Sequence, residues 1–144
     1  MVTLFFIILS YYWCDLWGSH NLGRKFVLLE GDKTEDRIIV YSTLKWGCCY
    51  TGIPIIPPKV NDKYTSHIDK VKSNQKFIIA RSVNRDGNFS YWIVNKEFEF
   101  DLEKWRDKNC DSVLQKNIYG PFKFDSLKKV SDSLKVNISL TKIK

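Results

Sequence analysis

Cysteine offers the widest choice of chemistry in this 144-residue chain, which contains four of them. Three, Cys48, Cys49 and Cys110, are candidates for a disulfide if the protein is exported. Adjacent cysteines have Cα atoms only about 3.8 Å apart, below the roughly 4.4–6.8 Å of an ordinary bridge. A bond from Cys48 or Cys49 to Cys110 avoids that strain. It would close a loop of about 60 residues and stabilise the fold by about 4 kcal/mol. Three buried reduced thiols in a cytoplasmic protein are the alternative.

The fourth cysteine, Cys14, follows an N-terminal segment without a charged side chain. That segment is too short to cross a bilayer and suits the apolar part of an export signal. The signal of a bacterial lipoprotein ends directly before a cysteine that becomes acylated, so Cys14 is the candidate for lipidation and membrane anchoring. Tyr12 and Trp13 are bulkier than the small residues that normally precede such a cysteine. We interpret residues 1–17 as a degenerate or truncated export signal, with a buried strand over residues 4–9 as the alternative.

Histidines and carboxylates offer the other routes to catalysis or metal binding. The two histidines, His20 and His67, stand in no catalytic motif, which is typical of loop or surface positions. Glu97 and Glu99 alternate along a strand pattern, which is typical of a solvated face. The close ligand pairs of a zinc site and the glycine-rich loops that hold phosphates are both missing from the sequence. We therefore expect no catalytic residue, no metal ion and no cofactor, and a protein that is not an enzyme.

The chain is basic, with 23 Lys and Arg against 16 Asp and Glu, a formal charge of +7. Its densest basic region is residues 120–144, which hold six lysines and two aspartates. Exposed aromatic residues and arginines are not interleaved with these lysines, as a nucleic-acid surface would require. We expect a solvated lysine-rich face and no nucleic-acid partner, although anionic lipid headgroups would feel the same field. The six lysines are Lys123, Lys128, Lys129, Lys135, Lys142 and Lys144.

Length and composition predict one folded domain. A chain of this length with 44% apolar residues can bury a substantial core. Disorder, collagen-like repeats and coiled coil are excluded by the same composition. No internal repeat or long linker divides the chain, so we expect residues 18–144 to form a single α+β domain.

Several period-two segments separated by polar turns predict β-hairpins. Residues 26–29 and 38–41 flank a polar stretch and suit one hairpin. Residues 77–83 and 89–94 bracket Asp86-Gly87, which supplies the positive φ of a tight turn, and suit another. A further hairpin is expected to turn at Ser73-Asn74, although Tyr64, Ile68 and Val71 before it also have helical spacing. The intervening segment 46–58 contains three prolines, so a regular helix or a central strand is excluded there.

The C-terminal third predicts a helix. Residues 95–118 are charged and irregular, with a short helix as an option at 111–114, and Gly120-Pro121 is expected to break the chain. Asp125 or Ser126 can then cap a helix that places Leu127, Val130 and Leu134 on one side. Val136, Ile138 and Leu140 alternate with polar residues and predict a terminal strand. The expected fold is therefore α+β, mainly antiparallel β-sheet with hairpins and a short C-terminal helix followed by a terminal strand.

These segments together resemble a known family. The resemblance rests on residues 91–96 (Tyr-Trp-Ile-Val-Asn-Lys), residues 119–122 (Tyr-Gly-Pro-Phe) before the short helix, and residues 77–80 (Phe-Ile-Ile-Ala) after Ser73-Asn74. Over roughly residues 20–140 the chain resembles small bacterial envelope lipoproteins of a domain-of-unknown-function family. That resemblance implies export and a lipidated cysteine, for which Cys14 is the matching position. It implies no catalytic residues.

The sequence thus predicts a non-enzymatic, exported or lipid-anchored envelope protein that acts as a binding domain. A protein partner would be held by an exposed sheet face or by the loop from Cys48 to Pro58. The alternative is a cytoplasmic interaction protein of the inhibitor or immunity type, in which residues 4–9 form a buried strand.

Overall fold

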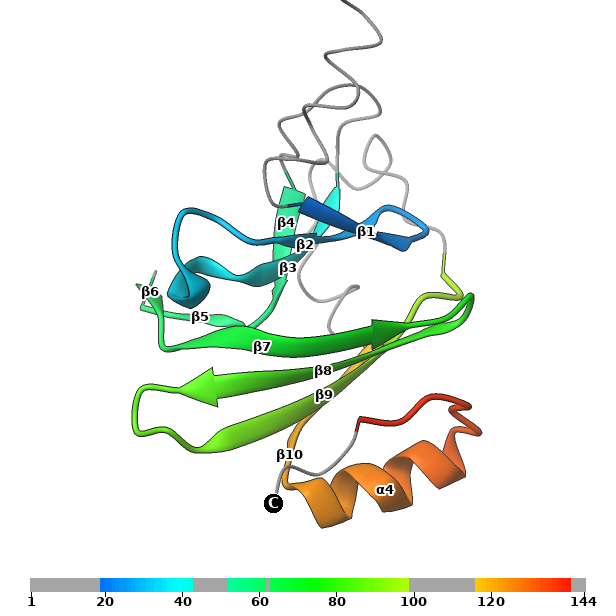
Figure 1. Cartoon of the computed structure of the whole chain (residues 1–144). Coiled ribbons are helices and arrows are strands. Elements are labelled where there is room, and N and C mark those ends of the chain that lie inside the picture. The colour runs from blue at the N-terminus through cyan, green and yellow to red at the C-terminus, as the bar shows by residue number, and fades with distance from the viewer. Residues whose placement is uncertain (1–18, 43–51, 62, 99–115, 141–144) are drawn as a thin grey trace, which may run out of the picture.

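The computed structural model describes residues 19–42, 52–61, 63–98 and 116–140 (Figure 1). Within them two four-stranded antiparallel sheets lie one above the other, and one α-helix packs beneath the second sheet. The predicted α+β class with mainly antiparallel sheet and a short C-terminal helix is confirmed. No helix within these residues is long and apolar enough to cross a membrane.

The first sheet has the strand order β1-β2-β3-β4. Its strands are β1 (Ser19–Gly23), β2 (Phe26–Leu29), β3 (Ile38–Ser42) and β4 (Gly52–Ile56), and a short 3-10 helix η1 (Thr34–Asp36) lies between β2 and β3. The hairpin predicted over residues 26–41 is confirmed, because Phe26 pairs with Tyr41 and Leu29 with Ile38. Pro54 lies in β4, on the outside of the four described strands, where a missing backbone N–H is tolerated.

His20 lies at the surface, as expected, but in strand β1 and not in a loop. Residues 19–23 pair with β2 through a turn in which Arg24 and Lys25 both have positive φ. Positive φ is unusual for arginine and lysine, so the residue types at these two positions do not reveal the tight turn in the sequence. His20 and Leu22 lie on the same face of the sheet as Leu28. This alternation covers too few residues of β1 to predict a strand from the sequence.

The second sheet has the order β10-β9-β8-β7. Its strands are β7 (Ser66–Ser73), β8 (Phe77–Asn84), β9 (Phe89–Asn95) and β10 (Ile118–Phe122), and a separate two-stranded ribbon is formed by β5 (Lys59–Val60) and β6 (Lys63–Tyr64). Both predicted hairpins are confirmed, and Gly87 has the expected positive φ of 81° in the β8–β9 turn. His67, expected on a surface or loop, lies half-buried in β7.

Strand β10 corrects the expected chain break at Gly120-Pro121. The strand runs through both residues and pairs with β9, with a shift of register between Tyr119 and Phe122. A Cβ atom at Gly120 would lie 2.7 Å from the carbonyl oxygen of Tyr91, so only glycine permits this approach. The irregular register lets an edge strand include a proline that cannot donate to the ladder.

Two hydrophobic clusters hold the layers together. The first fills the space between the two sheets, and the second lies between the second sheet and helix α4 (Phe124–Ser133). The buried residues of the first cluster are Leu22, Phe26, Leu28, Ile39, Tyr41, Ile55, Ile56, Ile68, Ile78, Ala80, Trp92 and Val94. Those of the second are Phe77, Ile79, Tyr91, Ile93, Leu127 and Leu140.

The C-terminal region differs from the prediction at two points. Helix α4 begins at Phe124 after Lys123, without a side-chain cap, so neither Asp125 nor Ser126 is the N-cap. Asp125 lies instead in the first turn, where its charge suits the helix dipole. Residues 136–140 form no strand, although their apolar side chains pack into the second cluster. They return between α4 and the second sheet (Figure 1). The helix suggested for residues 111–114 lies outside the described residues.

Candidate functional site

A charged groove runs along the outer edge of β7, where the second sheet meets the β1–β2 side of the first. Its volume is about 410 Å³. Residues from both sheets and from the C-terminal segment line it: His20, Leu28, Glu30, Arg37, Asp69, Lys70, Val71, Lys72 and Leu140. We call this the β7 groove. It brings together six ionisable side chains, those of His20, Glu30, Arg37, Asp69, Lys70 and Lys72.

The backbone of β7 is open to this groove. The N–H of Asn74 donates to the carbonyl of Phe77 at the end of the hairpin, so the backbone of Asn74 points toward β8. Because this direction alternates along a strand, the N–H and C=O of Val71 point away from β8. Ile68 also points away, and its N–H donates to the carbonyl of Arg37 at 2.8 Å. Val71 has no such partner within the described residues, and no described strand lies beyond β7.

On the side of the first sheet, three side chains meet at one carboxylate. Glu30 Oε1 lies 3.2 Å from His20 Nε2 and 3.4 Å from Arg37 Nη2. The histidine is well exposed, whereas the other two are about one-third exposed or less. These contacts keep the Glu30 carboxylate occupied and fix the polar rim of the groove on this side.

On the β7 side, Asp69 forms an ion pair with the buried Arg81 of β8. Arg81 is 2% exposed, and its Nη2 donates to Asp69 Oδ2. Its Nε and Nη1 groups are buried without a hydrogen-bond partner among the described residues. The ring of Phe89 covers the guanidinium, 4.2 Å from its central carbon, as in a cation–π contact. The negative charge of Asp69 is therefore neutralised by the buried guanidinium of Arg81 beneath the groove.

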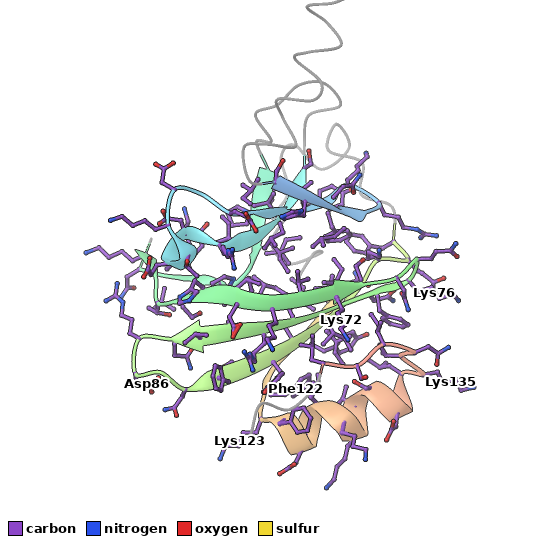
Figure 2. All side chains as sticks on the ribbon, in the orientation of Figure 1. Lys72, Lys76, Asp86, Phe122, Lys123 and Lys135 are labelled. Carbon is purple, nitrogen blue, oxygen red and sulfur yellow. The ribbon has the colours of Figure 1, made fainter. Side chains whose placement is uncertain are left out.

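Two lysines of the groove remain without an ionic partner. Lys70 and Lys72 make no ion pair with a described residue, whereas Asp69 and Glu30 are already engaged. Lys70 pairs in register with Arg81 and Lys72 with Ile79, so both lysines extend from the same face of β7. Figure 2 shows Lys72 on β7, apart from the lysines at the ends of α4. The groove can thus bind carboxylates with two positive charges spaced one residue apart.

A second polar cluster surrounds the buried Lys96. Its ammonium donates to the carbonyl of Leu22 at 2.6 Å and to Ser73 Oγ at 2.9 Å. Arg24 donates in turn to the carbonyl of Lys96 at 3.3 Å. Burial lowers the pKa of Lys96 from its ordinary value, and the positive charge of Arg24 lowers it further. The lysine ties β1 to the far end of β7 across the edge of the first hydrophobic cluster.

The second described cavity, of about 330 Å³, lies between helix α4 and the second sheet. It is bordered mainly by apolar side chains of the second cluster, among them Ile79, Leu127 and Ile138. It belongs to the packing of the helix on the sheet.

The residues singled out in the sequence lie largely elsewhere. Cys14, Cys48, Cys49 and Cys110 are all outside the described residues, so lipidation and the disulfide stay predictions. His67 lines neither described cavity, and Glu97 pairs with Lys76 at the surface, 3.2 Å apart. Within the described part of the chain, no group of three His, Cys, Asp or Glu side chains could hold a metal ion.

Sequence reasoning missed Arg81, Asp69 and Lys96. Arg81 is the single charged residue in the apolar run of residues 77–83, which is a usable indication of a buried cation. Its partner Asp69 is twelve residues earlier, with no pattern linking the two. Lys96 directly follows the apolar run of residues 91–94, and only the tertiary arrangement shows that it is buried.

Comparisons with known proteins gave no match, since no family model, no curated protein and no solved structure proved significantly similar to this chain.

We predict that Asp69→Asn destabilises the protein by about 2–3 kcal/mol, because it leaves the buried Arg81 guanidinium without its counter-charge. Urea denaturation followed by tryptophan fluorescence measures this. Glu97→Gln is the matched control, since its pair with Lys76 is exposed and should contribute about 0.5 kcal/mol or less. Equal effects of the two substitutions would contradict the assignment of Asp69 as the partner of a buried cation.

We further predict that Lys96 makes stability rise with pH in the alkaline range. Between its lowered pKa in the folded protein and its ordinary value of 10.5, the unfolded chain binds the proton more tightly. The free energy of unfolding therefore increases with pH in that window. Lys96→Met should remove this increase when the two proteins are compared up to about pH 9, because burial raises the pKa of Tyr64 from 10.0 and its titration opposes the increase only above that pH. Lys72→Met, at an exposed lysine, should leave the pH profile parallel to that of the wild type.

Proposed function

We propose that this chain is a non-enzymatic binding domain that holds an extended segment of a partner protein in the β7 groove. The observation that carries the proposal is the backbone of β7 at Val71, which pairs with no described strand, in a groove whose Lys70 and Lys72 have no ionic partner among the described residues. An exposed strand edge presents unpaired N–H and C=O groups, which a second chain can satisfy by adding a strand.

The surroundings of Val71 support recognition of one short segment. Arg37 already occupies the N–H of Ile68, so an added strand can pair only from about Val71 onward. Leu28 and Val71 provide an apolar surface in the same groove. Main-chain hydrogen bonds supply affinity in this mode of binding, and the side chains beside the edge supply selectivity.

We also propose that the domain works in the cell envelope, anchored by lipid on Cys14. The support is the position of Cys14 directly after an uncharged apolar segment, with the chain's basic excess lying beyond it. One lipid chain gives only marginal membrane binding, and a basic surface can add to it. A cytoplasmic interaction protein with an unprocessed N-terminus would use the same groove.

The binding role predicts that selection of random peptides on the full-length protein enriches ligands whose binding is lost in Val71→Pro. Proline at this position removes the N–H that points into the groove, but no bond to β8, so the sheet should persist. Fluorescence anisotropy with the enriched peptides measures the loss, and circular dichroism checks the fold. The proposal is wrong if no peptide is enriched, or if enriched peptides bind Val71→Pro as tightly as the wild type.

The anchoring role predicts a processed chain that begins at an acylated Cys14. Intact-mass spectrometry of the protein from its native membrane fraction measures this. A full-length chain with Met1 and a free Cys14 thiol would exclude the anchor and favour the cytoplasmic alternative.

A further inference from the structure

We infer that the segment bound in the β7 groove carries an acidic–apolar–acidic pattern and adds to the second sheet as a further strand beside β7. This inference rests on the proposed binding function and specifies the chemistry of the partner. It follows from three observations: the direction of the Val71 backbone, the two lysines that have no ionic partner in the described part of the chain, and the apolar surface between the sheets.

The backbone of Val71 sets the register of the added strand. Its N–H and C=O both point into the groove, so one partner residue can exchange two hydrogen bonds with it. The two neighbours of that partner residue then lie beside Lys70 and Lys72. Because side chains alternate between faces, these neighbours extend from the face that carries the two lysines.

Charge then determines what those neighbours are. Lys70 and Lys72 are the groove's cations without an ionic partner among the described residues, since Arg37 is held by Glu30. Directly opposite side chains of unlike charge stabilise a strand pair, and like charges destabilise it. Acidic residues on both sides of the central residue therefore fit, and basic ones do not.

The side chain of the central partner residue, opposite Val71, extends from the other face of the strand, toward the first sheet. Val71 packs against the first hydrophobic cluster, and Leu28 of β2 lines the groove above it. A side chain opposite Val71 on that face meets these apolar groups. An aliphatic residue between the two acidic ones completes the pattern.

A second copy of this chain is a poor occupant of the groove. Antiparallel pairing of two β7 strands about Val71 would set Lys70 of each copy against Lys72 of the other. Four lysines would then stand together without a carboxylate to neutralise them, which disfavours the pair. The chain's net charge of +7 likewise favours a distinct, acidic partner.

The test uses three labelled peptides of about seven residues, with Val alternating with Glu, Gln or Lys, and the full-length protein. Fluorescence anisotropy measures their binding. We expect the Glu peptide to bind about tenfold more tightly than the Gln peptide and the Lys peptide to bind most weakly. The advantage of the Glu peptide should shrink between about 50 mM and about 200 mM salt.

Variants of the protein locate the charge effect. Lys70→Gln with Lys72→Gln should abolish the preference for Glu over Gln and leave binding of the Gln peptide unchanged. Lys128→Gln with Lys129→Gln, at two exposed lysines of α4, is the matched control and should preserve the preference. Equal affinity of the Glu and Gln peptides, or an unchanged preference in the Lys70 and Lys72 variant, would overturn the inference.

A backbone control separates this inference from the proposed function. A Glu peptide that is N-methylated at every Val cannot donate to the Val71 carbonyl and should bind at least about tenfold more weakly. Sensitivity to N-methylation and to Val71→Pro without a preference for Glu would leave the binding function standing and refute the acidic pattern. Insensitivity of all peptides to both changes would refute strand addition itself, and with it the proposed function.

Discussion

The burial of β8 on both faces is the constraint on which the rest of this structure depends. Ile78 and Ala80 face the first sheet, and Phe77 and Ile79 face the helix. A strand covered on both sides needs two further layers, which the first sheet and α4 provide. The layers leave Arg81 no route to solvent from the middle of β8, so a counter-charge must come from a neighbouring strand.

The bulge in β7 meets this requirement and shapes the groove as well. The register between β7 and β8 shifts between Ile68 and Lys70, so Asp69 is an extra residue that reaches Arg81. The same shift lets Ile68 and Val71, three residues apart, both pack on the first cluster. Lys70 and Lys72, on either side of Val71, share the other face by the ordinary alternation of a strand. The bulge thus accounts for the neutralisation of the buried cation, while the ordinary alternation of the strand sets the spacing of the half-buried Lys70 and the exposed Lys72.

The regular parts of the fold could be predicted from the sequence, because local turn chemistry and period-two patterns determine them. The β8–β9 hairpin is an example, with Gly87 supplying the positive φ of its turn. The errors lie where tertiary contacts override such patterns: β10 runs through Gly120-Pro121 because only glycine permits the close approach to Tyr91. The candidate site could not be predicted from the sequence for a similar reason, because a one-residue bulge such as that at Asp69 has no recognisable sequence pattern.

The local arrangement of charges, more than their density along the chain, identifies the groove. The lysines concentrated after residue 120 include several on the exposed side of α4, which is an ordinary solvated helix surface. Lys70 and Lys72 lie in a stretch that also contains Asp69. Because Arg81 engages that carboxylate from below, the two lysines keep their charge available to a ligand. A buried cation therefore makes an exposed surface more positive, by occupying the carboxylate that would otherwise neutralise it.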